Sequence, residues 1–213
     1  MIKVVLVDDH QLVRTGIRRI LSDAEGIEVI GEADSGERAL EITRLLRPDV
    51  VLMDVHMPGI GGLEATRKLL RINSKLKILA LTVYGNEPYP SRLLEAGALG
   101  YLTKDCSARD MLNAIRTIAR GERYIHASIA RQMALSGLDG QPKNPFSRLS
   151  QREVQVMMMV TEGRRLQEIS EALCLSPKTV STYRYRLYEK LGVANDVELT
   201  RLAIRFGMIE KTQ

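Results

Sequence analysis

The first half of the chain alternates short apolar runs, rich in β-branched residues, with longer stretches of helical period. This alternation restricts the fold more than any other feature of the sequence. Five strands are expected, at residues 3–7, 27–31, 49–53, 77–81 and 99–103. After each strand, apolar side chains recur at the spacing of one helix face. Strands that alternate with helices form a parallel sheet through right-handed crossovers. The pattern therefore predicts a doubly wound α/β domain with five strand–helix repeats, (βα)5, over residues 1–121.

The apolar stripes expected on these helices indicate which side chains should be buried against the sheet. Two of them consist of Leu12, Ile17, Ile20 and Leu21 in the first helix and of Leu40, Ile42, Leu45 and Leu46 in the second. The chain has no Trp and only 4% aromatic residues, so aliphatic side chains and methionine must fill the core.

Four of the expected strands are followed by, or end beside, a polar residue suited to phosphate chemistry. In chain order these residues are Asp8 with Asp9, Asp54, Thr82 and Lys104. The carboxyl ends of strands in an open parallel sheet line one crevice, where ligands bind. Residues from both ends of the domain are therefore expected to meet in one site.

Three carboxylates in one crevice suit a magnesium ion, which prefers oxygen ligands and keeps several waters. Asp9 and Asp54 are expected to bind Mg²⁺ directly and Asp8 through water. The backbone carbonyl of His56 is the fourth expected ligand, because an imidazole is a poorer partner for so hard an ion. Asp54 then serves as a nucleophile that forms an aspartyl phosphate, with Lys104 balancing the charge of the phosphoryl oxygens. Thr82 is expected to hydrogen-bond one of these oxygens.

Each of these residues also has an ordinary interpretation when it is taken alone. Asp8 and Asp9 could cap a helix, Asp54 could occupy a turn, and Lys104 could be a solvated cation. Only their order, at successive strand ends, favours a site. The rival enzyme class, a phosphoaspartyl hydrolase of the haloacid dehalogenase type, needs a second acid two residues after the nucleophile. His56 stands at that position.

At these positions the chain resembles the receiver domain of two-component response regulators. The resemblance is carried by Val-Asp8-Asp9-His, Met53-Asp54-Val-His-Met57-Pro58, Leu-Thr82 and Tyr101-Leu-Thr-Lys104. It implies that Asp54 accepts a phosphoryl group from a sensor histidine kinase, and that Thr82 and Tyr101 form a switch pair. Tyr101 is also expected to be a half-buried residue of the sheet. The resemblance implies no enzymatic activity beyond promotion of the protein's own phosphorylation and dephosphorylation.

The second half of the chain carries no strand signal. Residues 122–146 are predicted to be a linker with a short helix at 125–135, because turn formers crowd its later part. An all-α domain follows over residues 147–213. Its four helices are expected at residues 150–162, 166–173, 178–191 and 197–205. Ser150 and Glu153 form a capping box at the first of these helices.

The second and third of these helices have the size of a helix-turn-helix, and the third is basic. This half resembles the LuxR-type DNA-binding domain. The matching stretches are Leu149-Ser-Gln-Arg-Glu153, Glu168-Ile-Ser, Leu175-Ser-Pro-Lys-Thr-Val180, Tyr183-Arg184, Glu189-Lys-Leu-Gly192-Val and Asn195. The resemblance implies that double-stranded DNA is contacted at its base edges by Ser181, Thr182 and Tyr185, and at its phosphates by Lys178, Thr179, Arg184 and Lys190.

A receiver joined to such a domain is typical of the NarL/FixJ class of response regulators. Two stretches, Leu173-Cys-Leu-Ser-Pro-Lys-Thr-Val180 and Thr182-Tyr-Arg-Tyr185, resemble a subgroup that activates transcription of small regulatory RNAs. By this resemblance, phosphorylation should release the recognition helix and promote a homodimer through residues 197–205. A constitutive DNA-binding protein with a silent receiver is the alternative, and the intact Asp54, Thr82 and Lys104 set argues against it.

Charge and cysteine content indicate the setting in which the protein works. Residues 1–121 carry a net charge of +1 and residues 122–213 a net charge of +4, which suits a polyanionic partner for the second half. An ordinary solvated basic surface would give the same charge. Cys106 and Cys174 fit no metal spacing and are expected to be buried or idle thiols of a reducing compartment. No apolar stretch approaches the roughly 20 residues that span a bilayer. We therefore expect a cytoplasmic protein without membrane contact.

Overall fold

The computed structural model describes residues 1–82, 89–136, 144–206 and 208–209 of the 213-residue chain. The described residues divide into two compact units, with the break after Leu135. No helix in these ranges combines the length and the apolar character that a membrane crossing requires.

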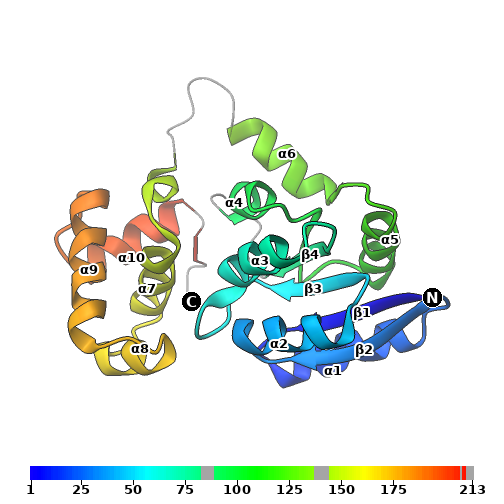
Figure 1. Ribbon diagram of the computed structural model, residues 1–213. Coiled ribbons are helices and arrows are strands. Elements are labelled where there is room, and N and C mark those ends of the chain that lie inside the picture. Colours follow the sequence, from blue (N-terminus) through cyan, green and yellow to red (C-terminus); the bar gives the residue numbers. More distant parts are fainter. Residues whose placement is uncertain (83–88, 137–143, 207, 210–213) are drawn as a thin grey trace. The chain divides into compact units, whose positions relative to one another are not determined.

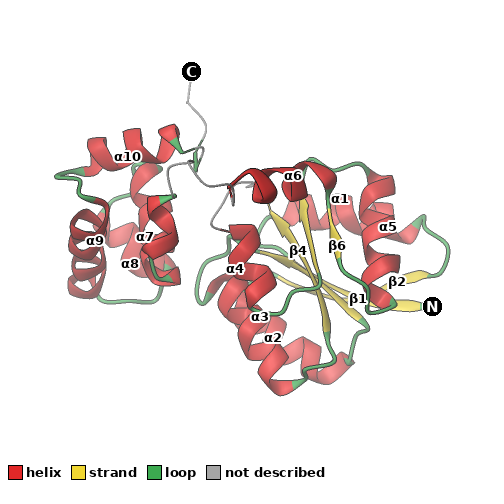
Figure 2. Cartoon of the chain, turned by 90° about the horizontal axis from the view of Figure 1, so that it is seen from above, coloured by secondary structure: helices red, strands yellow, loops and turns green. Residues whose placement is uncertain are grey.

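The first unit is built on a parallel sheet in the order β2-β1-β3-β4-β5-β6. Figure 2 shows the strands of this sheet surrounded by helices. Its strands are β1 Ile2–Val7, β2 Ile27–Ala33, β3 Val50–Asp54, β4 Lys77–Thr82, β5 Gly100–Thr103 and β6 Tyr124–Ile125. The strand order reverses between β1 and β3, where a doubly wound sheet opens a crevice at the carboxyl ends of its strands. The predicted fold class is confirmed.

Helices cover both faces of this sheet (Figure 1). They are α1 Gln11–Ser22, α2 Gly36–Leu46, α3 Gly61–Ile72, α4 Tyr89–Glu95 and α5 Ala108–Ala119. A further helix, α6 Ala127–Ser136, follows β6. Successive side chains of a strand point to opposite faces, so β1 contributes Leu6 to one core and Val7 to the other. The core that contains Leu6 is closed by α1 and α5. The core that contains Val7 is closed by α2 and α3.

The structure differs from the sequence prediction at the far edge of the sheet. Residues Tyr124 and Ile125 form a sixth strand, which pairs with Gly100 and Tyr101 of β5. Strand β6 and helix α6 both lie within the stretch expected to be a linker, and the compact unit extends to Leu135. Residues 137–143, the centre of that expected linker, lie outside the described residues. The domain boundary at 121 therefore stays a prediction.

Three members of the expected apolar stripes are exposed to solvent. Leu12 is 87% exposed on α1, and Leu45 and Leu46 are 80% and 36% exposed on α2, whereas Ile17, Leu21 and Ile42 are buried as predicted. Helical period alone places a residue to within about one position around the helix, so it does not define the edge of a stripe.

The second unit consists of short helices, as predicted. They are the 3-10 turn η1 Pro145–Arg148 and the helices α7 Gln151–Thr161, α8 Leu166–Ala172, α9 Pro177–Leu191 and α10 Asp196–Arg205. The predicted capping box at Ser150 and Glu153 is present. Helix α9 begins with a cap from the Ser176 hydroxyl and ends at Gly192, whose φ of +66° suits a residue without a side chain.

Candidate functional site

The carboxylates predicted to meet do meet. Asp8 follows β1 and Asp54 ends β3, and these neighbouring strands bring the two residues to the same rim of the sheet. Ligand atoms of Asp8, Asp9, His10 and Asp54 all lie within 4.8 Å of one another. Both Asp8 and Asp54 are buried. Such a set of carboxylates is an acidic pocket able to bind a metal ion.

Lys104 completes the pocket from the other side. Its Nζ lies 2.6 Å from Oδ2 of Asp8 and 2.8 Å from Oδ2 of Asp54. The backbone N–H of Lys104 donates to the carbonyl oxygen of Thr82 at 2.7 Å, which holds the end of β5 beside the end of β4. Thr82 itself is fully buried. The predicted residues from four strands thus share one end of the sheet.

The charges of this pocket depend on one another. Burial raises the pKa of Asp54 to about 6, and the charge of Lys104 offsets part of that rise. Burial alone would lower the pKa of Lys104, but the charge of Asp54 and hydrogen bonds to Asp54 and Asp8 raise it above its ordinary value. A buried carboxylate is destabilised unless a cation stays close. The donor set therefore fits a hard divalent cation, which would add positive charge beside Asp8 and Asp54.

The loop after β3 binds the side chain of Asp54 and packs closely against its backbone. The backbone N–H of His56 donates to Oδ1 of Asp54 at 3.2 Å. A Cβ atom on Gly62 would lie 1.8 Å from the carbonyl oxygen of Asp54, so only glycine allows the start of α3 to approach so closely. Gly61 has a φ of +68°. The glycines thus allow a tight strand-to-helix turn.

The imidazole of His56 faces Tyr89 at the start of α4. Its Nε2 lies 2.9 Å from the Tyr89 hydroxyl oxygen, and the two rings meet edge to face. Burial, and to a smaller extent the charge of Lys104, lower the pKa of His56 to about 4. The ring is therefore neutral at pH 7. The sequence carries no signal for this pair, because 33 positions separate its members.

His10 is a member of the cluster that the sequence analysis missed. Its Nδ1 lies 2.9 Å from Oδ1 of Asp9 and 3.5 Å from Oδ1 of Asp8. His10 occupies the N-cap position of α1 but makes no capping bond with its side chain. In the sequence, only the position of His10 directly after Asp8 and Asp9 could have indicated that it belongs to this cluster.

Tyr101, on β5, is fully buried. The expectation of a half-buried tyrosine is therefore wrong. Strand β5 is also not the edge of the sheet at this position, because β6 pairs with it there.

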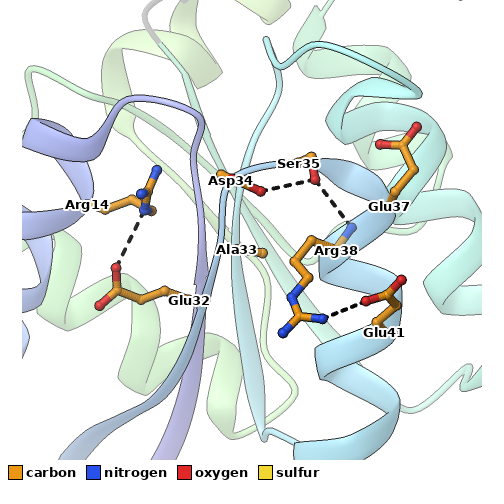
Figure 3. A pocket seen from close by; sticks show the side chains of 8 residues that line it. All are labelled: Arg14, Glu32, Ala33, Asp34, Ser35, Glu37, Arg38 and Glu41. Atoms are coloured by element: carbon orange, nitrogen blue, oxygen red, sulfur yellow. Dashed lines mark hydrogen bonds and ion pairs between the residues drawn. The ribbon is translucent and has the colours of Figure 1, made fainter. Parts of the chain in front are cut away.

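A polar groove of about 490 Å³ lies beside the acidic pocket, at the carboxyl end of β2 (Figure 3). Arg14 connects the two features. Its guanidinium donates to the backbone carbonyl of Asp8 at 2.6 Å and lies 3.5 Å from a carboxylate oxygen of Glu32. Helix α1 is thereby anchored to the strand end that carries Asp8.

In the second unit, α9 presents the predicted DNA-contacting residues on its surface. Exposed side chains on this helix include Lys178, Ser181, Thr182 and Lys190, and Tyr185 is 68% exposed. Val180 and Leu187 are buried on the opposite face. The helix therefore has the basic and hydroxyl-rich outer face that was expected.

Two of the cations expected to hold DNA phosphate are paired within the unit. Arg184 bonds the Asp196 carboxylate at the start of α10, and Tyr188 donates to the same carboxylate. Lys190 lies 2.8 Å from Oε2 of Glu153. These pairs attach α9 to its neighbours α10 and α7, a role that the sequence analysis did not foresee.

The turn between α8 and α9 contains Cys174, whose φ of +52° is unusual for a residue with a side chain. Cys174 is exposed, so of the two expectations for this thiol, that it is buried or that it is idle, the first does not hold. Cys106 is half-buried, and burial raises the pKa of its thiol.

Comparison with known proteins defines the class. Residues 4–116 match the family described as "Response regulator receiver domain", and residues 147–203 match "Bacterial regulatory proteins, luxR family". The chain belongs to the response regulators that join a receiver to a LuxR-type DNA-binding domain, and the resemblance noted in the sequence is confirmed. The rival enzyme class is not its family.

Particular relatives cover nearly the whole chain. Response regulator GacA of Pseudomonas syringae is 56% identical over 211 residues, 99% of each chain. Response regulator UvrY of Escherichia coli is 54% identical over 209 residues, which are 98% of this chain and 96% of UvrY. A solved structure of RcsB from Salmonella enterica, bound to promoter rprA in the presence of the phosphomimetic BeF3⁻, is 27% identical with a TM-score of 0.70. It covers 95% of this chain and 98% of RcsB.

Proposed function

We propose that Asp54 accepts a phosphoryl group from a sensor histidine kinase and that the phosphorylated protein binds DNA to regulate, most simply to activate, transcription. The observation that carries this proposal is the salt bridge from Lys104 to both Asp8 and Asp54, which places a cation where the charge of a phosphoryl group must be balanced. Membership of the response regulator family supports the same conclusion.

The residues of the pocket divide the work of phosphoryl transfer. Asp9 and Asp54 would hold Mg²⁺ directly, Asp8 would hold it through water, and the backbone carbonyl of His56 would be the remaining protein ligand. The ion, when bound, neutralises charge on the transferred group. A carboxylate oxygen of Asp54 attacks the phosphorus of a phosphohistidine. The new P–O bond forms as the P–N bond breaks, and the electron pair leaves with the imidazole nitrogen of the kinase.

Phosphorylation adds nearly two negative charges at Asp54. Thr82, buried at the end of the neighbouring strand, is the hydroxyl that hydrogen-bonds a phosphoryl oxygen. Tyr101 on β5 is the second member of the switch, and its ring is fully buried in the unphosphorylated form. The pair thus converts a local change of charge into one of two packing states.

Helix α9 enters the major groove in the DNA-bound form. Ser181, Thr182 and Tyr185 face base edges, while Lys178 and Thr179, with Arg184 and Lys190, contact phosphates. Val197 leaves an apolar side chain exposed on α10, which supports α10 as the face of a homodimer. Two recognition helices then reach half-sites one helical turn apart, about 34 Å.

The relatives extend this proposal. GacA and UvrY are named response regulators, and RcsB has been solved on promoter DNA. Resemblance of residues 173–185 to this subgroup supports small regulatory RNA genes as targets. The protein works in the cytoplasm and has no enzymatic activity beyond promotion of its own phosphorylation and dephosphorylation.

Intact mass spectrometry tests the acceptor. The full chain is incubated with acetyl phosphate and Mg²⁺, and the mass gained by one phosphoryl group is expected for the natural sequence and for the exposed-acid control Asp105→Asn. Asp54→Asn should gain no mass. Full labelling of Asp54→Asn would assign the phosphate elsewhere.

The same preparations test the coupling to DNA. A duplex selected from a random pool by the phosphorylated protein should bind phosphorylated protein at least about tenfold more tightly than the Asp54→Asn variant, the scale of a typical coupling free energy. Equal binding by both would mean that the receiver is silent.

A further inference from the structure

A second cavity lies in the receiver at the end of the sheet opposite Asp54. It has a volume of about 420 Å³ and is lined by residues of α2, of α3 and of the segments that lead into β3 and β4. Helices α2 and α3 lie side by side on one face of the sheet (Figure 1). The phosphorylation chemistry makes no use of this cavity, because Asp54 ends β3 at the other rim.

One wall of the cavity is apolar. Pro48, Leu69 and Leu76 are buried around it, and Ile72 at the end of α3 is 50% exposed. Cavities of about 300–1,000 Å³ with a mainly apolar lining and a few polar groups are the usual form of small-molecule sites. An apolar body seated here would cover surface that Ile72 now leaves in water.

A buried hydroxyl in this lining has no partner. Thr43 is only 8% exposed, and its Oγ1 makes no hydrogen bond to any of the residues that the structure describes. A buried polar group without a partner is unfavourable, because it has lost water and gained nothing in return. A ligand atom that accepts a hydrogen bond from Thr43 would remove that penalty.

Two guanidinium groups, Arg44 and Arg47, stand at the same cavity. Within the described ranges, neither side chain forms an ion pair or hydrogen bond. Arg47 also has a φ of +49°, at the end of α2, where glycine would be less strained. Guanidinium groups bind carboxylates through paired hydrogen bonds, and such charge-assisted bonds are among the strongest polar contacts.

We propose that this cavity binds a small aliphatic carboxylate. The alkyl chain lies on Leu69, Leu76 and Ile72, the two arginines hold the carboxylate, and the hydroxyl of Thr43 donates to one of its oxygens. The site is independent of the phosphoryl acceptor and gives the receiver a second chemical input.

Hexanoate is the probe for this proposal. It is titrated into the ¹⁵N-labelled full chain at pH 7 and constant ionic strength, with hexanol and hexylamine in parallel. Saturable shifts are expected for the backbone amides of Thr43, Arg47 and Leu76 with hexanoate, and none that saturate with hexylamine. Absence of saturable shifts with hexanoate, or equal affinity for hexanol, would overturn the proposal.

Variants separate the ligand contacts from the fold. Arg47→Gly keeps a residue that tolerates positive φ and should weaken hexanoate binding about tenfold, the effect of one lost charge-assisted contact. Arg67→Gln, on the exposed face of α3, is the matched loss of charge and should leave the affinity unchanged.

Thr43→Val should change stability and ligand affinity in opposite directions. The melting temperature of the unliganded protein should rise, because the variant removes an unpaired buried hydroxyl. The affinity for hexanoate should fall, because the hydrogen bond to the carboxylate is lost. A lower melting temperature together with unchanged affinity would show that Thr43 only stabilises the fold. It would contradict the hydrogen bond that we assign from its hydroxyl to the carboxylate.

Discussion

The two units of this response regulator build their sites in opposite ways. The receiver collects Asp8, Asp54 and Lys104 from three separate strands and buries both carboxylates. The DNA-binding unit places its outer face on a single helix, α9, with Ser181 and Tyr185 in contact with solvent. One site depends on long-range packing, and the other depends on one local segment.

This difference has a thermodynamic consequence. Buried charges in the receiver lose hydration, so they need close partners. A small displacement of such a partner therefore destabilises the fold. Exposed side chains on α9 are hydrated in the free protein, so replacement of the proposed DNA contacts should change binding with little effect on folding. Substitutions of increasing mildness test that contrast.

The largest effect is expected from Gly62→Ala. Its Cβ would lie 1.8 Å from the carbonyl oxygen of Asp54 and 2.9 Å from Cα of Val55, so the start of α3 must move. The free energy of unfolding, measured with urea, should fall by about 3 kcal/mol, at the upper end for overpacking. Gly16→Ala is the control, since a Cβ at Gly16 meets nothing within 4 Å. Equal stability of both variants would contradict the packing argument.

A second effect concerns pH. The pKa of His56 falls from 6.5 to about 4 on folding. Between these two pH values, the unfolded chain binds a proton at His56 and the folded receiver does not. The free energy of unfolding is therefore unaffected by His56 above pH 6.5 and decreases as the pH falls toward 4. At pH 5, in the presence of EDTA, that loss amounts to about 2 kcal/mol.

Replacement of the imidazole should remove this pH dependence. His56→Gln keeps a polar side chain near the Tyr89 hydroxyl but does not titrate. The difference in unfolding free energy between the natural protein and the variant should therefore shift in favour of the variant by about 2 kcal/mol between pH 7.5 and pH 5. A constant difference across this range would show that His56 keeps an ordinary pKa.

A smaller effect, of opposite sign, is expected in the helical unit. Cys174→Gly relieves a left-handed backbone conformation in the turn before α9. Its unfolding free energy should rise by up to about 1 kcal/mol, because glycine adopts that conformation without a steric penalty. Cys174→Ala keeps the Cβ and should bring no gain. A gain of equal size with alanine would point to the thiol rather than to the backbone.

The smallest effect is expected from a substitution on the exposed face of α9. Lys178→Ala should leave thermal stability unchanged and reduce the slope of log K against log salt for DNA by about 0.9, the value for one phosphate contact. Lys75→Ala, an exposed lysine of the receiver, is the matched control. A slope that stays the same in Lys178→Ala would remove this residue from the phosphate contacts.

The sequence predicted what depends on periodicity and on strand ends. The parallel sheet, the meeting of Asp8, Asp54 and Lys104, and the capping box at Ser150 follow from local pattern and from the geometry of parallel strands. Side chains that interact across the fold could not be predicted in this way. Tyr89 reaches His56 only because α4 packs near the site, and no local pattern reports such a contact.

Other misses arise where a neighbouring element changes the surroundings of a residue. The two-residue strand β6 is too short to show a period, yet it pairs with β5 beside Tyr101, so β5 is an inner strand of the sheet. Leu12 and Leu45 sit at the borders of their helical stripes, where a shift of one position decides between core and solvent. Pairing of Arg184 with Asp196 likewise depends on how α10 meets α9.

Glu153 illustrates how one carboxylate can serve two elements. It accepts a hydrogen bond from the backbone of Ser150 at the start of α7 and an ion pair from Lys190 near the end of α9. In a genetic screen for loss of promoter activity, we expect substitutions at Glu153 to be recovered alongside those on the outer face of α9. Their defect originates in the scaffold, and compensating changes should therefore arise on α7 or α9 rather than in the promoter.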